Sequence, residues 1–134
     1  MRMRFALIAL GLLLLSPARA QDLQDEPREL DFVGFQQFKE VSRVFVRTNE
    51  QARYHVNAGR DGVVVLTIEN TGCSVANHLR HLDTHFFNGP VTLIQPKLIE
   101  GPSNSIEIDI FLRRGVTARQ SQKDNVINLD FPRE

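Results

Sequence analysis

Apolar and polar residues alternate with a period of two along most of this chain. The segment Ser105–Leu112 shows the pattern most clearly, because its even-numbered positions are all apolar and its odd-numbered positions include two acids. A period of two places alternate side chains on opposite faces of a β-strand. Further strands are predicted at Leu30–Phe35, Arg43–Thr48, Arg53–Ala58, Val63–Ile68, Val91–Glu100, Val116–Gln122 and Val126–Phe131. No segment keeps a helical period for more than about two turns, so the pattern predicts an all-β domain.

Short polar segments separate these predicted strands. Gly59-Arg60-Asp61-Gly62 lies between two of them, and an Asp-Gly pair in that position is a strong hairpin signal. Lys123-Asp124-Asn125 separates the last two strands in the same way. Pro96 interrupts the segment Val91–Glu100. Because proline cannot donate a backbone hydrogen bond, it indicates a sheet edge or a bulge.

The order of elements repeats once. Residues 42–68 and 105–131 each consist of two predicted strands, a charged turn and an apolar strand, and a shift of 63 positions aligns them. The aligned pairs are Asp61 with Asp124, Val64 with Ile127, Leu66 with Leu129, and Ile68 with Phe131. With one upstream strand added to each half, the halves predict two similar, roughly four-stranded sheets packed as a β-sandwich. The alternative, that any two meanders look alike, stays open because identity between the halves is slight.

The N-terminus has the three parts of a secretory signal peptide. Arg2 and Arg4 precede the apolar run Phe5–Leu15, and Ser16–Ala20 ends in the small-x-small pattern of a cleavage site. The run is well below the ~20 apolar residues that span a bilayer, and no second run follows. We therefore expect residues 1–20 to be a signal peptide, 21–29 a polar leader and 30–134 the folded domain of an exported protein without stable membrane insertion.

Charge and cysteine content exclude several classes of exported protein. After removal of residues 1–20, 13 basic and 16 acidic residues remain, which gives a net charge of −3 with the histidines neutral. Without a basic excess, nucleic-acid binding is disfavoured, and no polybasic segment is present to hold the chain on a membrane surface. Cys73 is the only cysteine, so the thiol is either buried or forms an intermolecular bridge.

Metal binding and catalysis are weakly supported. His78, His81 and His85 would share one face if residues 74–85 were helical. Cys73 and Asp83 are close in sequence, and zinc accepts all three ligand types. The spacing matches no common zinc signature, however, so a polar surface loop is the favoured interpretation and no metal or other cofactor is expected. The sequence has no G-x-S-x-G nucleophile motif, and we do not expect an enzyme.

The segment 66–94 resembles part of the AMIN domain family. Leu66-Thr67-Ile68-Glu69-Asn70-Thr71 is similar to the family's strand that ends in an Asn-Thr-like turn, and it leads to the L-D-T sequence Leu82-Asp83-Thr84. Pro90-Val91-Thr92-Leu93-Ile94 is similar to the family's P-V-x-x-I strand. Ser42–Val46 and Tyr54–Val56 correspond to its first hairpin, so the resemblance covers about residues 30–131.

This resemblance implies a fold, a location and a role. AMIN domains are periplasmic modules made of two related four-stranded sheets. They precede cell-wall amidase domains and type IV pilus secretins, where they target the protein or bind peptidoglycan. No amidase or secretin segment follows in this sequence, so we expect only the binding role, with peptidoglycan as the first candidate. The alternative is a protein–protein adaptor or an accessory component of a pilus or secretin assembly, which pairs a partner strand with a sheet edge.

The polar faces of two central strands carry the candidate binding residues. An aromatic side chain among charges is unusual on such a face. It suits a glycan, because the ring stacks on a sugar while arginines bind carboxylates bidentately. The alternative is that Phe45 and Phe111 are covered by neighbouring strands or by the leader. Phe86 and Phe87 are expected to clamp the long connection to the sandwich rim. The candidate ligand-binding residues are Arg43, Phe45, Arg47 and Arg53 on the first face, and Glu107, Asp109, Phe111 and Arg113 on the second.

Overall fold

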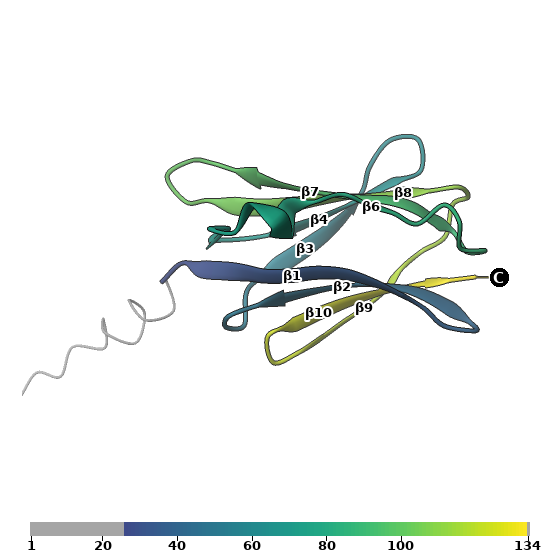
Figure 1. Ribbon diagram of the computed structural model, residues 1–134, viewed down its shortest axis with the longest axis horizontal. Coiled ribbons are helices and arrows are strands. Elements are labelled where there is room, and N and C mark those ends of the chain that lie inside the picture. Colours follow the sequence, from purple (N-terminus) through teal and green to yellow (C-terminus); the bar gives the residue numbers. More distant parts are fainter. Residues whose placement is uncertain (1–25, 134) are drawn as a thin grey trace, which may run out of the picture.

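The computed structural model describes residues 26–133, which form two five-stranded sheets stacked as a β-sandwich (Figure 1). Sheet one has the order β5-β1-β2-β10-β9, and sheet two has the order β3-β4-β8-β7-β6. The strands are β1 (Arg28–Gln37), β2 (Val41–Thr48), β3 (Tyr54–Ala58), β4 (Val63–Ile68), β5 (Thr71–Gly72), β6 (Leu82–Asp83), β7 (Val91–Ile99), β8 (Ser105–Leu112), β9 (Arg119–Lys123) and β10 (Val126–Pro132). The all-β sandwich is confirmed. The predicted signal peptide and residues 21–25 of the leader lie outside the described residues.

The predicted alternation decides which side chains form the core. On β2, Val44 and Val46 are fully buried between the sheets, whereas the alternate residues Arg43, Phe45 and Arg47 face outward. On β8, Ile106, Ile108 and Ile110 are likewise fully buried. The partner strands supply matching apolar positions, so one continuous core lies between the two layers. Every candidate residue on β2 and β8 is therefore placed on an outer face.

The two sheets are not the two halves of the repeat, which corrects the expectation that each half forms its own sheet. The first half places β1 and β2 in sheet one but β3 and β4 in sheet two, and the second half places β7 and β8 in sheet two but β9 and β10 in sheet one. Each sheet thus joins one hairpin from each half, and Figure 1 shows the chain crossing between layers. Alternation determines which face of a strand is buried, but it does not determine which strand lies beside it.

The turns and the proline behave as their residues predict. Val63 N–H donates to the carbonyl of Arg60 across the β3–β4 turn at 3.1 Å. Asp61 and Gly62 have φ values of 54° and 77°, as a type I′ turn requires. Pro96 lies on β7, which pairs with β8 on one side. On its other side, among the described residues, β7 pairs only with the two-residue strand β6, at Leu93 and Ile94. Pro96 therefore lies on an unpaired stretch of sheet edge.

Helical structure is limited to one short segment within residues 26–133. This is the 3₁₀ turn η1 (Ala76–Leu79), so residues 74–85 do not form the helix on which a shared histidine face would depend. None of the described residues belongs to a helix with the length and apolar character that crossing a membrane would require.

Candidate functional site

The outer face of sheet one carries two phenylalanine rings over a glycine. Phe32 and Gly34 face outward on β1, and Phe45 lies directly opposite Gly34 on β2. The two ring centroids are 5.8 Å apart. A Cβ atom at position 34 would lie only 2.7 Å from Phe32 Cε2 and 2.8 Å from Phe45 Cε1. The two rings therefore occupy the space that the side chain of any other residue would need. A glycine inside a strand often allows such a close approach of neighbouring groups to the backbone.

Two arginines flank the Phe32 ring. The guanidinium carbon of Arg47 lies 5.8 Å from the ring centroid, and that of Arg80 lies 5.3 Å away, both within the range of a cation–π contact. Arg80 also donates to the edge carbonyl of Val33 at 3.3 Å. Within residues 26–133, the exposed guanidinium of Arg47 has no hydrogen-bond or ion-pair partner. Phe32, Gly34, Phe45, Arg47 and Arg80 are called the aromatic–arginine face below.

Arg43, the other predicted cation on β2, is already paired. It binds Asp130 on β10 through two parallel hydrogen bonds, Nε to Oδ1 at 2.7 Å and Nη2 to Oδ2 at 2.9 Å. The hydrogen bond to Asp130 raises the pKa of Arg43 above its ordinary value, against the effect of burial. Arg43 also lies 5.1 Å from the Phe38 ring. Asp130 already occupies the Nε–Nη2 edge of this guanidinium, so Arg47 is the arginine of β2 whose forked edge is not bound to a carboxylate.

Arg53 lies apart from this face. It precedes β3 in sheet two and lines a groove of about 870 Å³ at one end of the sandwich, together with Gln51, Ser103 and Gln122. Its neighbour His55 is on the outer face of sheet two, where it lies 3.7 Å from Glu69. The structure therefore does not join Arg53 to the aromatic–arginine face.

The outer face of sheet two holds the remaining acids in an ion-pair cluster. Lys97 Nζ lies 3.3 Å from Glu107 and 3.5 Å from Asp109, and the hydrogen bond to Glu107 is the main cause of the raised pKa of Lys97. Phe111 is half-buried on the same face, opposite Val63 on β4. The two predicted faces belong to different sheets, so they point away from each other across the core.

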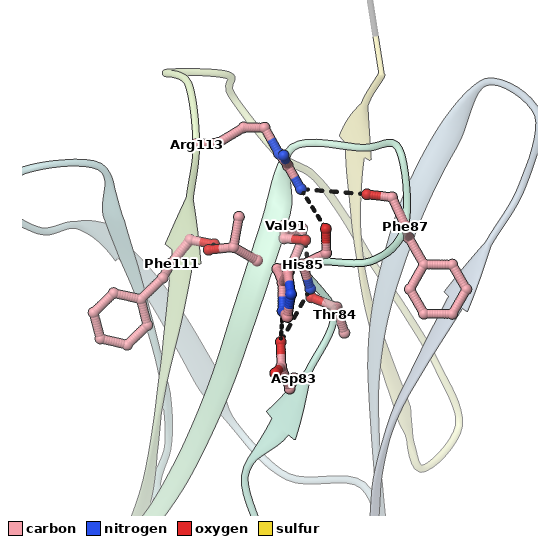
Figure 2. A network of polar contacts seen from close by, with 8 residues as sticks. Asp83, Thr84, His85, Phe87, Val91, Phe111 and Arg113 are labelled. Carbon is pink, nitrogen blue, oxygen red and sulfur yellow. Dashed lines mark hydrogen bonds and ion pairs between the residues drawn. The ribbon is translucent and has the colours of Figure 1, made fainter.

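Arg113 is bound into a turn. Its Nε donates to the carbonyl of Gly89 at 2.8 Å, and its Nη2 donates to the carbonyls of His85 at 3.0 Å and Phe87 at 3.3 Å. Figure 2 shows this side chain reaching from the end of β8 into the connection between β6 and β7. A structural role thus occupies its Nε and Nη2, and its predicted role in ligand binding has no support from this geometry.

The partners of His78, His85 and Cys73 are all different. His78 donates through Nδ1 to the edge carbonyl of Leu30 at 3.1 Å, and His85 contacts the Asp83 carboxylate, which lowers the pKa of Asp83. Among the described residues, no three metal-ligating side chains lie close enough to hold an ion. Cys73 is partly exposed, its Sγ donates to the carbonyl of Val75 at 3.1 Å, and burial raises the pKa of the thiol.

Three members of the aromatic–arginine face are absent from the predicted set. Gly34 between aromatic residues is a detectable signal, because a glycine inside a strand often marks a close approach of side chains. Phe32 lies two positions before Gly34 and shares its face, although a bulge in β1 blurs the alternation there. Arg80 gives no signal, because it belongs to a non-periodic segment 48 residues away from Phe32 in the sequence.

Comparisons with protein-family models, with curated proteins and with solved structures return no match for this chain. The described geometry defines an all-β sandwich whose outer faces carry charged and aromatic side chains.

Proposed function

We propose that this protein is an exported, non-catalytic binding module of the bacterial envelope that binds peptidoglycan through the aromatic–arginine face. The supporting observation is the guanidinium of Arg47, which has no hydrogen-bond or ion-pair partner among residues 26–133 and lies near the Phe32 ring on the same outer face as the half-buried Phe45. The N-terminal sequence and the resemblance to AMIN domains support export to the periplasm, where the cell wall is the abundant polymer.

The chemistry of this face suits a glycan that carries carboxylates. Phe45 offers an apolar ring surface, and a ring of this kind stacks on the apolar face of a sugar. Arg47 offers a planar fork of donors, which matches a carboxylate better than a single ammonium would. Peptidoglycan combines both features, since its sugars carry peptide stems that end in carboxylates. Arg80, which donates to the Val33 carbonyl, adds a positive charge beside the neighbouring Phe32 ring.

Sedimentation of the mature protein with purified sacculi tests this proposal. We expect protein in the pellet at moderate salt and progressive release as salt rises, because exposed charges are screened over roughly 8–10 Å at physiological ionic strength. Arg47→Ala should weaken binding about tenfold, by loss of one charge-assisted contact. Arg47→Lys, which keeps the charge but not the fork, should give an intermediate loss.

The matched control is Arg60→Ala. Arg60 lies in the exposed turn between β3 and β4 of sheet two, so this change removes the same charge from a different surface. It should leave sacculus binding unchanged. Protein that stays in the supernatant at every salt concentration, or equal losses for Arg47→Ala and Arg60→Ala, would overturn the proposal.

A further inference from the structure

The connection between β6 and β7 presents an exposed phenylalanine. Phe86 is 79% exposed, more than any other large apolar side chain among residues 26–133. The expected clamp is formed only by its neighbour Phe87, whose ring centroid lies 5.2 Å from that of Phe35 on β1. Residues 84–90 are called the Phe86 turn below. One exposed apolar side chain is ordinary on a protein surface, so its meaning depends on how the turn is held.

Charged side chains hold the backbone of the Phe86 turn in place. Arg113 donates to three of its carbonyls, at residues 85, 87 and 89, and Arg133 donates through Nε and Nη2 to one more, at Asn88. At its start, the Thr84 hydroxyl donates to the carbonyl of Val91 at 2.8 Å (Figure 2). Hydrogen bonds from charged donors are about twice as strong as neutral ones. The turn is therefore ordered before any partner arrives.

The Phe86 ring itself is also positioned. Its centroid lies 3.9 Å from that of the His85 ring, and His85 Nδ1 donates to Oδ1 of Asp83. A side chain that already has such a contact loses less conformational entropy on binding than one with none, for which ordering costs roughly 0.5–1.5 kcal/mol. Asp83, which joins this ring pair through His85, is half exposed, and its second carboxylate oxygen has no hydrogen-bond partner among the described residues.

We infer that the Phe86 turn docks a second envelope protein, whose surface has an apolar pocket bordered by a lysine or arginine. Phe86 enters the pocket, and the basic residue pairs with the carboxylate of Asp83. A glycan is disfavoured here, because four backbone carbonyls that could accept hydrogen bonds from sugar hydroxyls are already bound by Arg113 and Arg133. Aromatic side chains are enriched in protein–protein interfaces, and the few residues that carry most of the binding energy lie near the centre in well-packed pockets. This surface is separate from the aromatic–arginine face, so either assignment can fail alone.

Photo-crosslinking in the cells that produce the protein tests this inference. The full chain would carry a photoreactive phenylalanine analogue, p-benzoylphenylalanine, at position 86, and the same analogue at position 99 as the control. Ile99 is 39% exposed and lies at the end of β7. We expect one discrete protein adduct from position 86 that is absent from position 99 and reduced by Asp83→Asn in the same chain. The captured protein is then purified for affinity measurements.

The affinity of that partner for the wild-type chain and three variants decides the outcome. Phe86→Ala should weaken binding at least about 30-fold, as truncation of a central anchor does. Asp83→Asn should weaken it several-fold, and only this loss should shrink as salt rises. Ile99→Ala should change nothing. An adduct with glycan, an adduct with a second copy of this chain, no adduct specific to position 86, or equal affinities for Phe86→Ala and Ile99→Ala would each overturn the inference.

Discussion

Replacement of Gly34 by alanine should disrupt the aromatic–arginine face while the backbone of β1 stays in place. Gly34 is covered by Phe32 and Phe45, and a new Cβ would lie within 2.8 Å of atoms in both rings. No real Cβ tolerates such distances, so the rings must move away from β1. They are the ends of side chains rather than backbone, and therefore the strand itself can stay in place while the face above it is disrupted.

The expected free-energy change is the balance of two effects. Gly→Ala in an unstrained position stabilises a protein by roughly 0.4–1 kcal/mol, because the unfolded chain loses freedom. Forcing the rings aside costs about 1–3 kcal/mol as overpacking, which includes the loss of an aromatic pair contact of about 0.5–1.5 kcal/mol. We therefore expect Gly34→Ala to lower the free energy of unfolding by about 1–2 kcal/mol. The matched control is Gly115→Ala, because a Cβ at position 115 meets no atom within 4 Å and that residue's φ is unstrained.

Urea denaturation of both variants measures this difference. Gly115→Ala should equal or exceed the wild type, while Gly34→Ala should have a lower midpoint at an unchanged slope, since the extent of surface exposed on unfolding is similar. Sacculus binding by folded Gly34→Ala should also weaken, because Phe45 and Arg47 lose their arrangement. If Gly34→Ala proved as stable as Gly115→Ala, the rings would not be packed on the glycine, and the reasoning would be refuted.

Two further predictions concern single ion pairs. Since the His85 contact lowers the pKa of Asp83 in the folded state, the folded chain binds fewer protons than the unfolded chain between the two pKa values. The stabilisation is complete above the ordinary aspartate pKa of about 3.9 and is lost as pH falls through the lower folded value. The urea midpoints of wild type and Asp83→Asn should therefore converge on acidification, and a constant gap down to strongly acidic pH would contradict this. The side chains of Arg43 and Asp130 are 32% and 17% exposed. A double-mutant cycle with alanine, measured by urea denaturation, should give a coupling free energy of about 1 kcal/mol for this pair. Additive losses of stability in the two single variants would show that the pair does not hold β2 to β10.

Local periodicity was sufficient for the longer strands and for the faces they bury, but it gave no sign of the two-residue strands β5 and β6 and placed the start of β9 three residues too early. Val44 and Ile108 are buried and Arg47 faces outward because successive side chains of a strand must point to opposite sides. The Asp61-Gly62 turn was equally predictable, since few residue pairs adopt two positive φ values. The sequence also identified Phe45 and Arg47 as an unusual combination on a polar face. These properties depend on a few neighbouring residues and on backbone geometry alone.

The assembly of those strands was decided only in three dimensions. Alternation does not determine whether a strand pairs with a strand from its own half of the sequence or from the other half. The exchange of hairpins between the sheets depends on how all the buried side chains pack together in the core. Arg43 and Arg47 have the same residue type and the same face, yet only Arg43 lies opposite Asp130, which is 87 residues away in the sequence. Arg113 continues the alternation of β8, but its side chain donates to a backbone carbonyl of the Phe86 turn. By itself the sequence determined which side chains face solvent, because that follows from local geometry, whereas the tertiary structure decided which of them remain free, because their partners come from distant segments.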